Sequence, residues 1–284
     1  MPFLLAHDVH GAPIVAGADS QVAFVLHGIL GNRNNWRTFA RRLAAGLAAS
    51  AGRPWSVVTV DQRHHGDSAV PPGSDPGRDS IAGCADDLAA LADFLGVRPM
   101  MTVGHSFGGK VALCHADRHP DGLAEVWVLD SPPGPAAASR AEMDNEVLRV
   151  IQALRDVPTP LERREHIVRE LLARGLPEPM ALWMTTNLGQ TAGGFEFRFN
   201  LEGAERMIAD YFDWDGWPTL LRPRLAPRIE IVRAERSDRW DEPTLARLQA
   251  LHGDVPTRLH VLPNAGHWLH ADNPGGLLAM MLGS

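Results

Sequence analysis

A serine flanked by two glycines separates a strand-like stretch of this chain from a helix-like one. Residues 104–108 read Gly-His-Ser-Phe-Gly, residues 99–103 before them are apolar and of strand length, and residues 109–116 after them are small and helix-forming. When a strand turns sharply into a helix through Gly-x-Ser-x-Gly, the serine takes a strained backbone conformation, and a side chain at either glycine position would collide with the neighbouring elements. The pattern predicts that Ser106 is a nucleophile at the end of a strand, with the side chain of His105 pointing away from it.

Strand-like and helix-like segments alternate along most of the chain. Helices are expected around residues 36–47, 80–95, 109–116, 242–251 and 274–282. Strands are expected at residues 3–8 and 13–16, which form an opening hairpin, and at 21–26, 55–60, 99–103, 123–129, 228–233 and 257–262. This alternation predicts an α/β fold with a mostly parallel, eight-stranded sheet and helices on both faces.

The rhythm changes between residues 135 and 227. Helical patterns cover residues 140–155, 160–174, 177–186 and 202–212, and residues 195–201 alternate with a period of two. We expect a helical cap or lid, inserted after the sixth strand, between two parts of an α/β core formed by residues 1–134 and 228–284. The methionines and tryptophans of residues 180–217 suggest an apolar pocket beneath this cap.

Candidate catalytic side chains follow the strands. His27, Asp61, Ser106 and Asp130 each stand just past an expected strand end, and reactive groups of parallel sheets collect at the carboxyl ends of the strands. A serine hydroxyl needs a base within hydrogen-bonding reach, and the base needs an acceptor that orients it. His267, on the loop after the last expected strand, is the candidate base.

Two aspartates satisfy the chain order Ser, Asp, His that is typical of such sites. Asp130 ends the strand that follows the serine, which should be its neighbour in the sheet. Asp238 follows the strand after the insertion, the commoner position for the acid, but it stands one residue later than the usual Gly-x-x-Asp pattern, which places Ser237 there. We prefer Asp130 and keep Asp238 as the alternative.

Acyl transfer also needs donors for a developing oxyanion. One is expected to be the backbone N–H of Phe107, directly after the nucleophile. The other is expected from the turn after the His27 strand, at the N–H of Ile29, where Gly28 and Gly31 allow a close approach of the backbone.

Four stretches together resemble the α/β-hydrolase superfamily in order and spacing. They read H-G-I-L-G at 27–31, D-Q-R-H-H-G-D-S at 61–68, G-H-S-F-G-G-K at 104–110 and P-N-A-G-H-W-L-H at 263–270. More narrowly, L-D-S-P-P at 129–133 and G-G-F-E-F-R-F-N-L at 193–201 are similar to a branch of small bacterial esterases that includes a mitochondrial abhydrolase. The resemblance covers almost the whole chain.

The resemblance to that branch implies which residues complete the site. It places the acid at Asp130 and a serine that assists the histidine at Ser237. The chain departs from the branch at residues 233–236, Arg-Ala-Glu-Arg, where the branch is rich in glycine, so both candidate acids remain open at this point.

Composition limits the class of protein. The net charge of −7 and the lack of basic runs do not suggest a nucleic-acid partner. The only cysteines, Cys84 and Cys114, cannot make a disulfide framework. His267 and His270 have no third ligand at a spacing suited to a metal, and no segment has the apolar length of a membrane span or the pattern of a signal peptide. We expect a cytoplasmic protein without cofactor or metal.

These observations predict a carboxylesterase-like serine hydrolase. Its substrate would be a small carboxylic ester or acyl thioester with an apolar acyl group, cleaved through an acyl-enzyme on Ser106, His267 and Asp130. The same triad also suits C–C bond hydrolysis, lactone opening or perhydrolysis, and a ligand-binding protein that retained the fold is the remaining alternative.

Overall fold

A parallel sheet with one antiparallel edge strand forms the centre of the protein. The computed structural model describes residues 3–16, 21–69, 75–136, 140–222, 227–251 and 256–283. Within these residues the sheet has seven strands in the order β1-β3-β2-β4-β5-β8-β9, and only β1 runs antiparallel to its neighbour. The strands are β1 His7–Gly11, β2 Gln21–Leu26, β3 Trp55–Val60, β4 Met101–His105, β5 Glu125–Leu129, β8 Arg228–Ala234 and β9 Thr257–Leu262.

The expected opening hairpin is wrong, and this lowers the strand count from eight to seven. β1 pairs with β3 as an edge strand, but residues 12–16 form no strand. Gly11 turns the backbone at φ +89°, and the next N–H, that of Ala12, donates to the carbonyl of Trp55. Pro13 has no N–H to continue a ladder. The insertion consequently follows the fifth strand of the chain and not the sixth.

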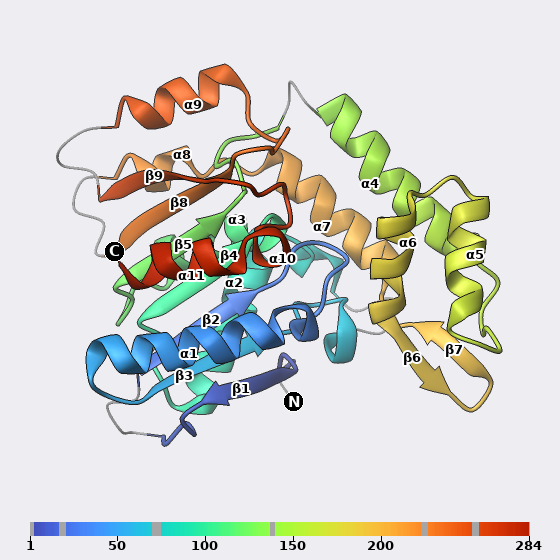
Figure 1. Cartoon of the computed structure of the whole chain (residues 1–284), viewed down its shortest axis with the longest axis horizontal. Coiled ribbons are helices and arrows are strands. Elements are labelled where there is room, and N and C mark those ends of the chain that lie inside the picture. The colour runs from blue at the N-terminus through green and yellow to red at the C-terminus, as the bar shows by residue number, and fades with distance from the viewer. Residues whose placement is uncertain are drawn as a thin grey trace.

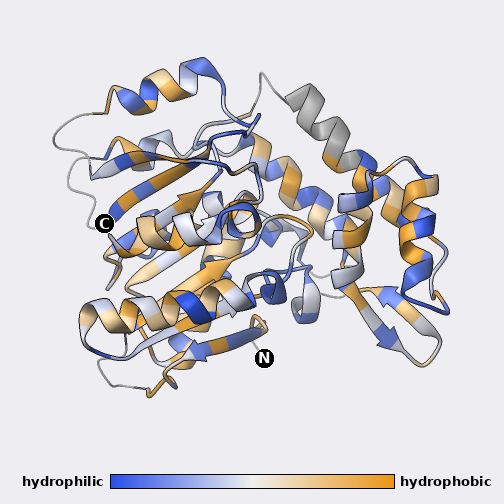
Figure 2. Ribbon diagram, in the orientation of Figure 1, coloured by the Kyte–Doolittle hydropathy of each residue, from blue (hydrophilic) through white to orange (hydrophobic). Residues whose placement is uncertain are grey.

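Helices cover both faces of the sheet (Figure 1). One face packs against α1 Arg37–Ala51 and α11 Pro274–Leu282, and the other against α2 Ile81–Leu95, α3 Phe107–Arg118 and α9 Glu242–Gln249. The side chains of β2 divide between the two apolar clusters, with Phe24 in one and Val25 in the other. Because both faces are buried, the central strands are apolar along their length, as Figure 2 shows.

The segment between β5 and β8 has two structural parts. Helices α4 Arg140–Arg155, α5 Glu165–Ala173 and α6 Glu178–Met184 share a separate apolar cluster, and the antiparallel hairpin of β6 Leu188–Thr191 and β7 Gly194–Phe197 follows them. Helix α7 Leu201–Asp213 instead packs into the main cluster of the core, and α8 Trp217–Leu220 follows it. The division into a core and a cap at residues 134/135 and 227/228 stays a prediction.

Short helices complete the described chain. They are η1 Arg33–Trp36, η2 Gly66–Ser68, η3 Pro76–Arg78, η4 Thr185–Asn187 and α10 Leu269–Asp272. In the part of the chain that the structure describes, no helix combines the length and apolar composition needed to cross a bilayer.

A buried lysine joins α3 to the start of the inserted segment and to the end of α7. Lys110 is the only lysine of the sequence and its side chain is 1% exposed. Its Nζ donates to the carbonyl oxygen of Gly134, at 2.8 Å, where the chain leaves the sheet. It also donates to the carbonyls of Tyr211, at 2.7 Å, and Trp214, at 3.1 Å, where α7 ends. Burial lowers the pKa of Lys110 from 10.5 to about 7, although nearby aspartates oppose the shift.

Candidate active site

The turn from β4 into α3 holds Ser106 in a conformation that few residues adopt. Its φ of +52° and ψ of −117° lie in a strained region, and its N–H donates to the carbonyl of Leu129 on β5. A Cβ atom at Gly104 would lie 1.9 Å from the carbonyl oxygen of Gly108, and one at Gly108 would lie 2.6 Å from that of His27. The backbones approach so closely that both positions require glycine, as the motif predicts.

His267 lies on the loop after β9 and is oriented by a carboxylate. Its Nδ1 is 2.8 Å from Oδ2 of Asp130. Because an ionised carboxylate only accepts hydrogen bonds, Nδ1 carries the proton and Nε2 is left as the basic nitrogen. His267 and Ser106 line the same cavity, so the structure brings together the serine, the histidine and one of the two candidate acids.

The acid beside His267 is Asp130, at the end of β5. Its carboxylate is buried, and Oδ2 also accepts a hydrogen bond from the hydroxyl of Ser237 at 2.6 Å. Oδ1 accepts from the N–H of Ala234 at 3.0 Å and from the indole N–H of Trp240 at 2.7 Å. Burial by itself would raise the pKa of Asp130. The hydrogen bonds from His267, Ser237 and Trp240 lower this pKa and hold it below its usual value.

The alternative acid lies elsewhere. The side chain of Asp238 is 88% exposed and contacts Nε of Arg239 at 3.3 Å. Ser237, which the resemblance places beside the histidine, donates instead to Asp130. Ala234, Ser237 and Trp240 therefore supply hydrogen-bond donors to Asp130, in the segment that carries the alternative acid.

One predicted oxyanion donor, Ile29, lines the cavity, and the other, Phe107, directly follows Ser106 in the chain. Phe107 is the first residue of α3, where a helix leaves its backbone N–H groups without acceptors of its own, and Ile29 lies in the cavity wall. The next residue, Leu30, has a φ of +58° and donates its N–H to Nε2 of His65 at 3.0 Å. The conformation of this turn is thus tied to a buried histidine that the sequence analysis did not select.

Two buried histidines hold the turn as neutral acceptors. Nε2 of His27 accepts the N–H of Gln62 at 3.1 Å, and Nε2 of His65 accepts that of Leu30. Burial lowers the pKa of His27 to about 4 and that of His65 to about 3. Both rings therefore remain uncharged at neutral pH and keep these lone pairs available.

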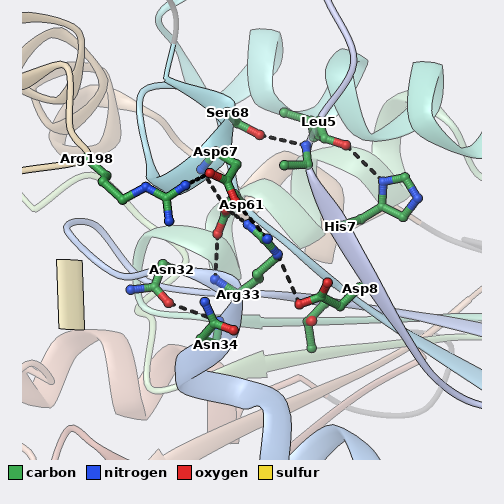
Figure 3. Close-up of polar contacts among 12 residues, drawn as sticks. Leu5, His7, Asp8, Asn32, Arg33, Asn34, Asp61, Asp67, Ser68 and Arg198 are labelled. Atoms are coloured by element: carbon green, nitrogen blue, oxygen red, sulfur yellow. Dashed lines mark hydrogen bonds and ion pairs between the residues drawn. The ribbon is translucent and has the colours of Figure 1, made fainter. Parts of the chain in front are cut away.

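An ionic cluster fixes the chain on the other side of the turn (Figure 3). Arg33 forms ion pairs with Asp8 of β1, at 3.0 Å, with Asp67 of η2, at 2.7 Å, and with the buried Asp61. Arg198, which follows the β6–β7 hairpin, pairs with Asp67. The strand-end residue Asp61 is therefore part of a structural cluster that anchors η1 and reaches the inserted segment.

The side chain of His105 contacts the loop that carries His267. Its expected direction away from Ser106 stays a prediction. Nε2 of His105 lies 2.7 Å from the carbonyl oxygen of His267, and the two rings are 4.7 Å apart. His270 stacks on Trp36 at 4.0 Å beside them. Burial lowers the pKa of His105 well below its usual value and that of His270 to about 4, so both rings are uncharged at neutral pH.

A cavity of about 130 Å³ opens above Ser106. Its wall from the inserted segment is apolar and comes from Val147 and Val150 of α4, Met180 and Trp183 of α6, and Ile208, Tyr211 and Phe212 of α7. Val150 and Met180 also line a second cavity, of about 490 Å³, between α4 and α6. The two side chains thus stand between the two cavities.

The sequence of this chain is similar to those of known proteins. The profile of a family described as "Alpha/beta hydrolase family" matches residues 23–280. The sn-1-specific diacylglycerol lipase ABHD11 of Mus musculus is 28% identical over 252 residues, which are 88% of this chain and 76% of that protein. A 2-succinyl-6-hydroxy-2,4-cyclohexadiene-1-carboxylate synthase of Serratia proteamaculans is 25% identical over 269 residues, 92% of each chain.

Solved structures agree in fold. A marine microorganism esterase superposes with a TM-score of 0.80 at 22% identity and covers 99% of both chains. An E-2-(acetamidomethylene)succinate hydrolase superposes with a TM-score of 0.72 at 21% identity and covers 98% of this chain and 94% of its own. At these identities the likeness is one of fold.

Proposed function

This chain belongs to the alpha/beta hydrolase family, and on that premise we propose that it is a serine hydrolase that cleaves carboxylic esters through an acyl-enzyme. The observation that carries the proposal is the hydrogen bond between His267 and the buried Asp130, at a cavity that also exposes Ser106. The relative in Mus musculus is named as a lipase of diacylglycerol, whose acyl chains are joined by ester bonds.

Each group has a role that follows from its position. His267 takes the hydroxyl proton through Nε2 while Oγ of Ser106 attacks the ester carbonyl, and Asp130 stabilises the imidazolium that forms. The N–H groups of Phe107 and Ile29 donate to the oxyanion. The imidazolium then gives its proton to the leaving alcohol, and the acyl-enzyme remains.

Water completes the cycle. His267 removes a proton from a water molecule as it attacks the acyl carbonyl, and returns that proton to Oγ of Ser106 when the carboxylic acid leaves. The apolar wall of the cavity favours an apolar acyl group, and a thioester would react at the same groups. A cytoplasmic location stays a prediction.

Replacement of the nucleophile tests the proposal. Hydrolysis of p-nitrophenyl esters of graded acyl length by Ser106→Ala should fall by about 10⁴- to 10⁶-fold, since the residual rate over water comes from the oxyanion donors and binding. A fluorophosphonate probe should label the wild-type chain and not the variant.

The matched control is Ser56→Ala, which removes a buried hydroxyl bonded to the carbonyl of Ala12, away from the cavity. It should keep both activity and labelling. If Ser106→Ala hydrolyses esters at a rate near that of the wild type, the proposal is wrong. An unlabelled, inactive wild type would favour a ligand-binding protein, and turnover of lactones, peroxide or C–C substrates in preference to esters would favour the alternative chemistries.

A further inference from the structure

The indole of Trp240 contacts the proposed acid directly, and no other observation assigns it a role. Its Nε1 donates to Oδ1 of Asp130 at 2.7 Å, and 110 residues separate the two in the chain. We propose that Trp240 is a positioning residue, which fixes the carboxylate of Asp130 and thereby sets the basicity and orientation of His267. The inference rests on the serine hydrolase function proposed above and goes beyond it.

The two carboxylate oxygens have separate partners. Oδ2 is bonded to His267 and Ser237, whereas Oδ1 is bonded to the N–H of Ala234 and to Trp240. A carboxylate with a donor on one oxygen alone can rotate about its Cβ–Cγ bond. Donors on Oδ1 oppose that rotation and keep Oδ2 directed at Nδ1 of His267.

The indole is itself held on both sides. Its side chain is buried in the main apolar cluster together with Leu245 and Leu248 of α9. The next residue, Asp241, caps α9 by accepting the N–H of Thr244 at 2.8 Å. Trp240 therefore cannot leave the carboxylate without a change at the start of α9, which makes it a rigid support for the acid.

The effect on His267 has a definite sign. The hydrogen bond from Trp240 stabilises the full negative charge of Asp130 more than it stabilises the neutralised pair of Asp130 and imidazolium. Loss of the indole N–H therefore destabilises the state with a neutral imidazole more than the protonated state. The pair of Asp130 and His267 should therefore take up a proton more readily, whichever of the two groups holds it.

Other ionisable groups face the pair but do not titrate in the same range. His105 of β4 contacts the His267 ring, His270 of α10 contacts His105, and both are kept neutral by burial. Asp272 lies behind His270 and tends to raise its pKa. Arg239 lines the same cavity. We therefore assign the acid limb of the rate profile to the pair of Asp130 and His267.

The test is Trp240→Phe, which keeps an aromatic ring and removes the donor. The acid limb of kcat/KM, which reports the free enzyme, should move to higher pH by about half a unit or more. On the plateau, kcat should fall about 3- to 10-fold with little change in KM, because the loosened carboxylate no longer holds the imidazole in its reactive orientation.

Trp55→Phe is the matched control. Trp55 is 8% exposed against 9% for Trp240, and among the described residues its indole N–H has no hydrogen-bond partner. It should leave the acid limb in place. If the acid limb of Trp240→Phe coincides with that of Trp55→Phe, Trp240 only fills space and the inference is wrong.

The wild-type protein provides a second test that does not depend on folding of a variant. Of the eight indole N–H signals expected from the tryptophans, one should shift with pH at the midpoint of the acid limb. If none titrates there, the indole is not coupled to the pair and the inference fails. Ser106→Ala separates the two proposals, since retained hydrolysis in that variant would overturn the serine mechanism itself, whatever Trp240 does.

Discussion

Replacement of Lys110 by methionine should destabilise the protein strongly, because it leaves two buried carbonyls and one partly buried carbonyl without their donor. Met has a similar length but no N–H groups, so the carbonyls of Gly134, Tyr211 and Trp214 lose contacts of 2.8, 2.7 and 3.1 Å. An orphaned buried acceptor costs about 1–3 kcal/mol, and removal of the desolvated amine offsets part of that sum.

We expect a net loss of about 3 kcal/mol at pH 8, where the neutral amine has two N–H groups to donate to these carbonyls. For a chain of this size that loss corresponds to a fall in Tm of about 6–12 °C. Urea-induced unfolding followed by tryptophan fluorescence measures the free energy. Arg118→Met on the same helix is the control, since it removes only an exposed ion pair with Asp86 and should cost at most about 1 kcal/mol.

The pH dependence provides a second check with a definite sign. Burial lowers the pKa of folded Lys110 from 10.5 to about 7, so between these values the unfolded chain binds more protons than the folded chain. The free energy of unfolding should therefore rise with pH across this window. The penalty on the folded state is complete below pH 7, and the difference between wild type and Lys110→Met should be larger at pH 9 than at pH 6.

A selective ¹⁵N-lysine label gives a direct reading of this group, because the sequence contains only one lysine. Its single side-chain signal should titrate near pH 7. The reasoning is refuted if Lys110→Met unfolds at the same urea concentration as Arg118→Met, or if the stability difference shrinks as the pH is raised.

Three further predictions concern the site. Asp130→Asn should lower kcat about 10⁴-fold, whereas Asp238→Asn, at an exposed side chain, should keep a kcat near that of the wild type. Steady-state rates of the two variants test this, and equal losses would contradict the assignment of Asp130 as the acid. His65→Phe removes the acceptor of the Leu30 N–H and should lower kcat about tenfold at constant KM, so a change in KM alone would argue against it. Met180→Ala should open the wall between the two cavities and raise kcat/KM for long acyl esters about tenfold over short ones, and an unchanged chain-length profile would exclude that wall as the limit.

The local motifs allowed much of the site to be predicted. Gly104 is required by a backbone contact with Gly108, within a few residues of Ser106, and Gly108 by the carbonyl of His27 at the end of the neighbouring strand. The pattern therefore predicts the turn. The carboxyl ends of parallel strands meet at one edge of the sheet, which is why His27 and Asp130 could be expected near the serine before any contact was seen.

The acid could not be settled in the same way. β8 lies between β5 and β9, so Asp130 reaches His267 across the end of β8, and the chain order of strands does not reveal that crossing. Asp238 follows β8 itself, yet the turn after Ala234 directs Ser237 inward to the carboxylate and leaves Asp238 at the surface. A shift of one residue in this turn would decide whether Ser237 or Asp238 faces the site.

Contacts over long separations in the chain left no local signal. Trp240 lies 110 residues from Asp130, and His105 lies 162 residues from His267. The opening hairpin was a different kind of miss, because residues 13–16 are apolar enough for a strand but Gly11 turns the chain and Pro13 cannot donate to a ladder.

Because the only lysine is buried, its chemical reactivity can report local opening of the folded protein. An amine-directed acylating reagent finds a single ε-amino group here, and that group is enclosed between α3, the start of the inserted segment and the end of α7. Lys110 can react only when this joint separates, since the folded arrangement keeps the reagent out. The rate at which Lys110 is modified, read by peptide mass, would therefore count how often α7 lifts from the nucleophile helix in the native protein.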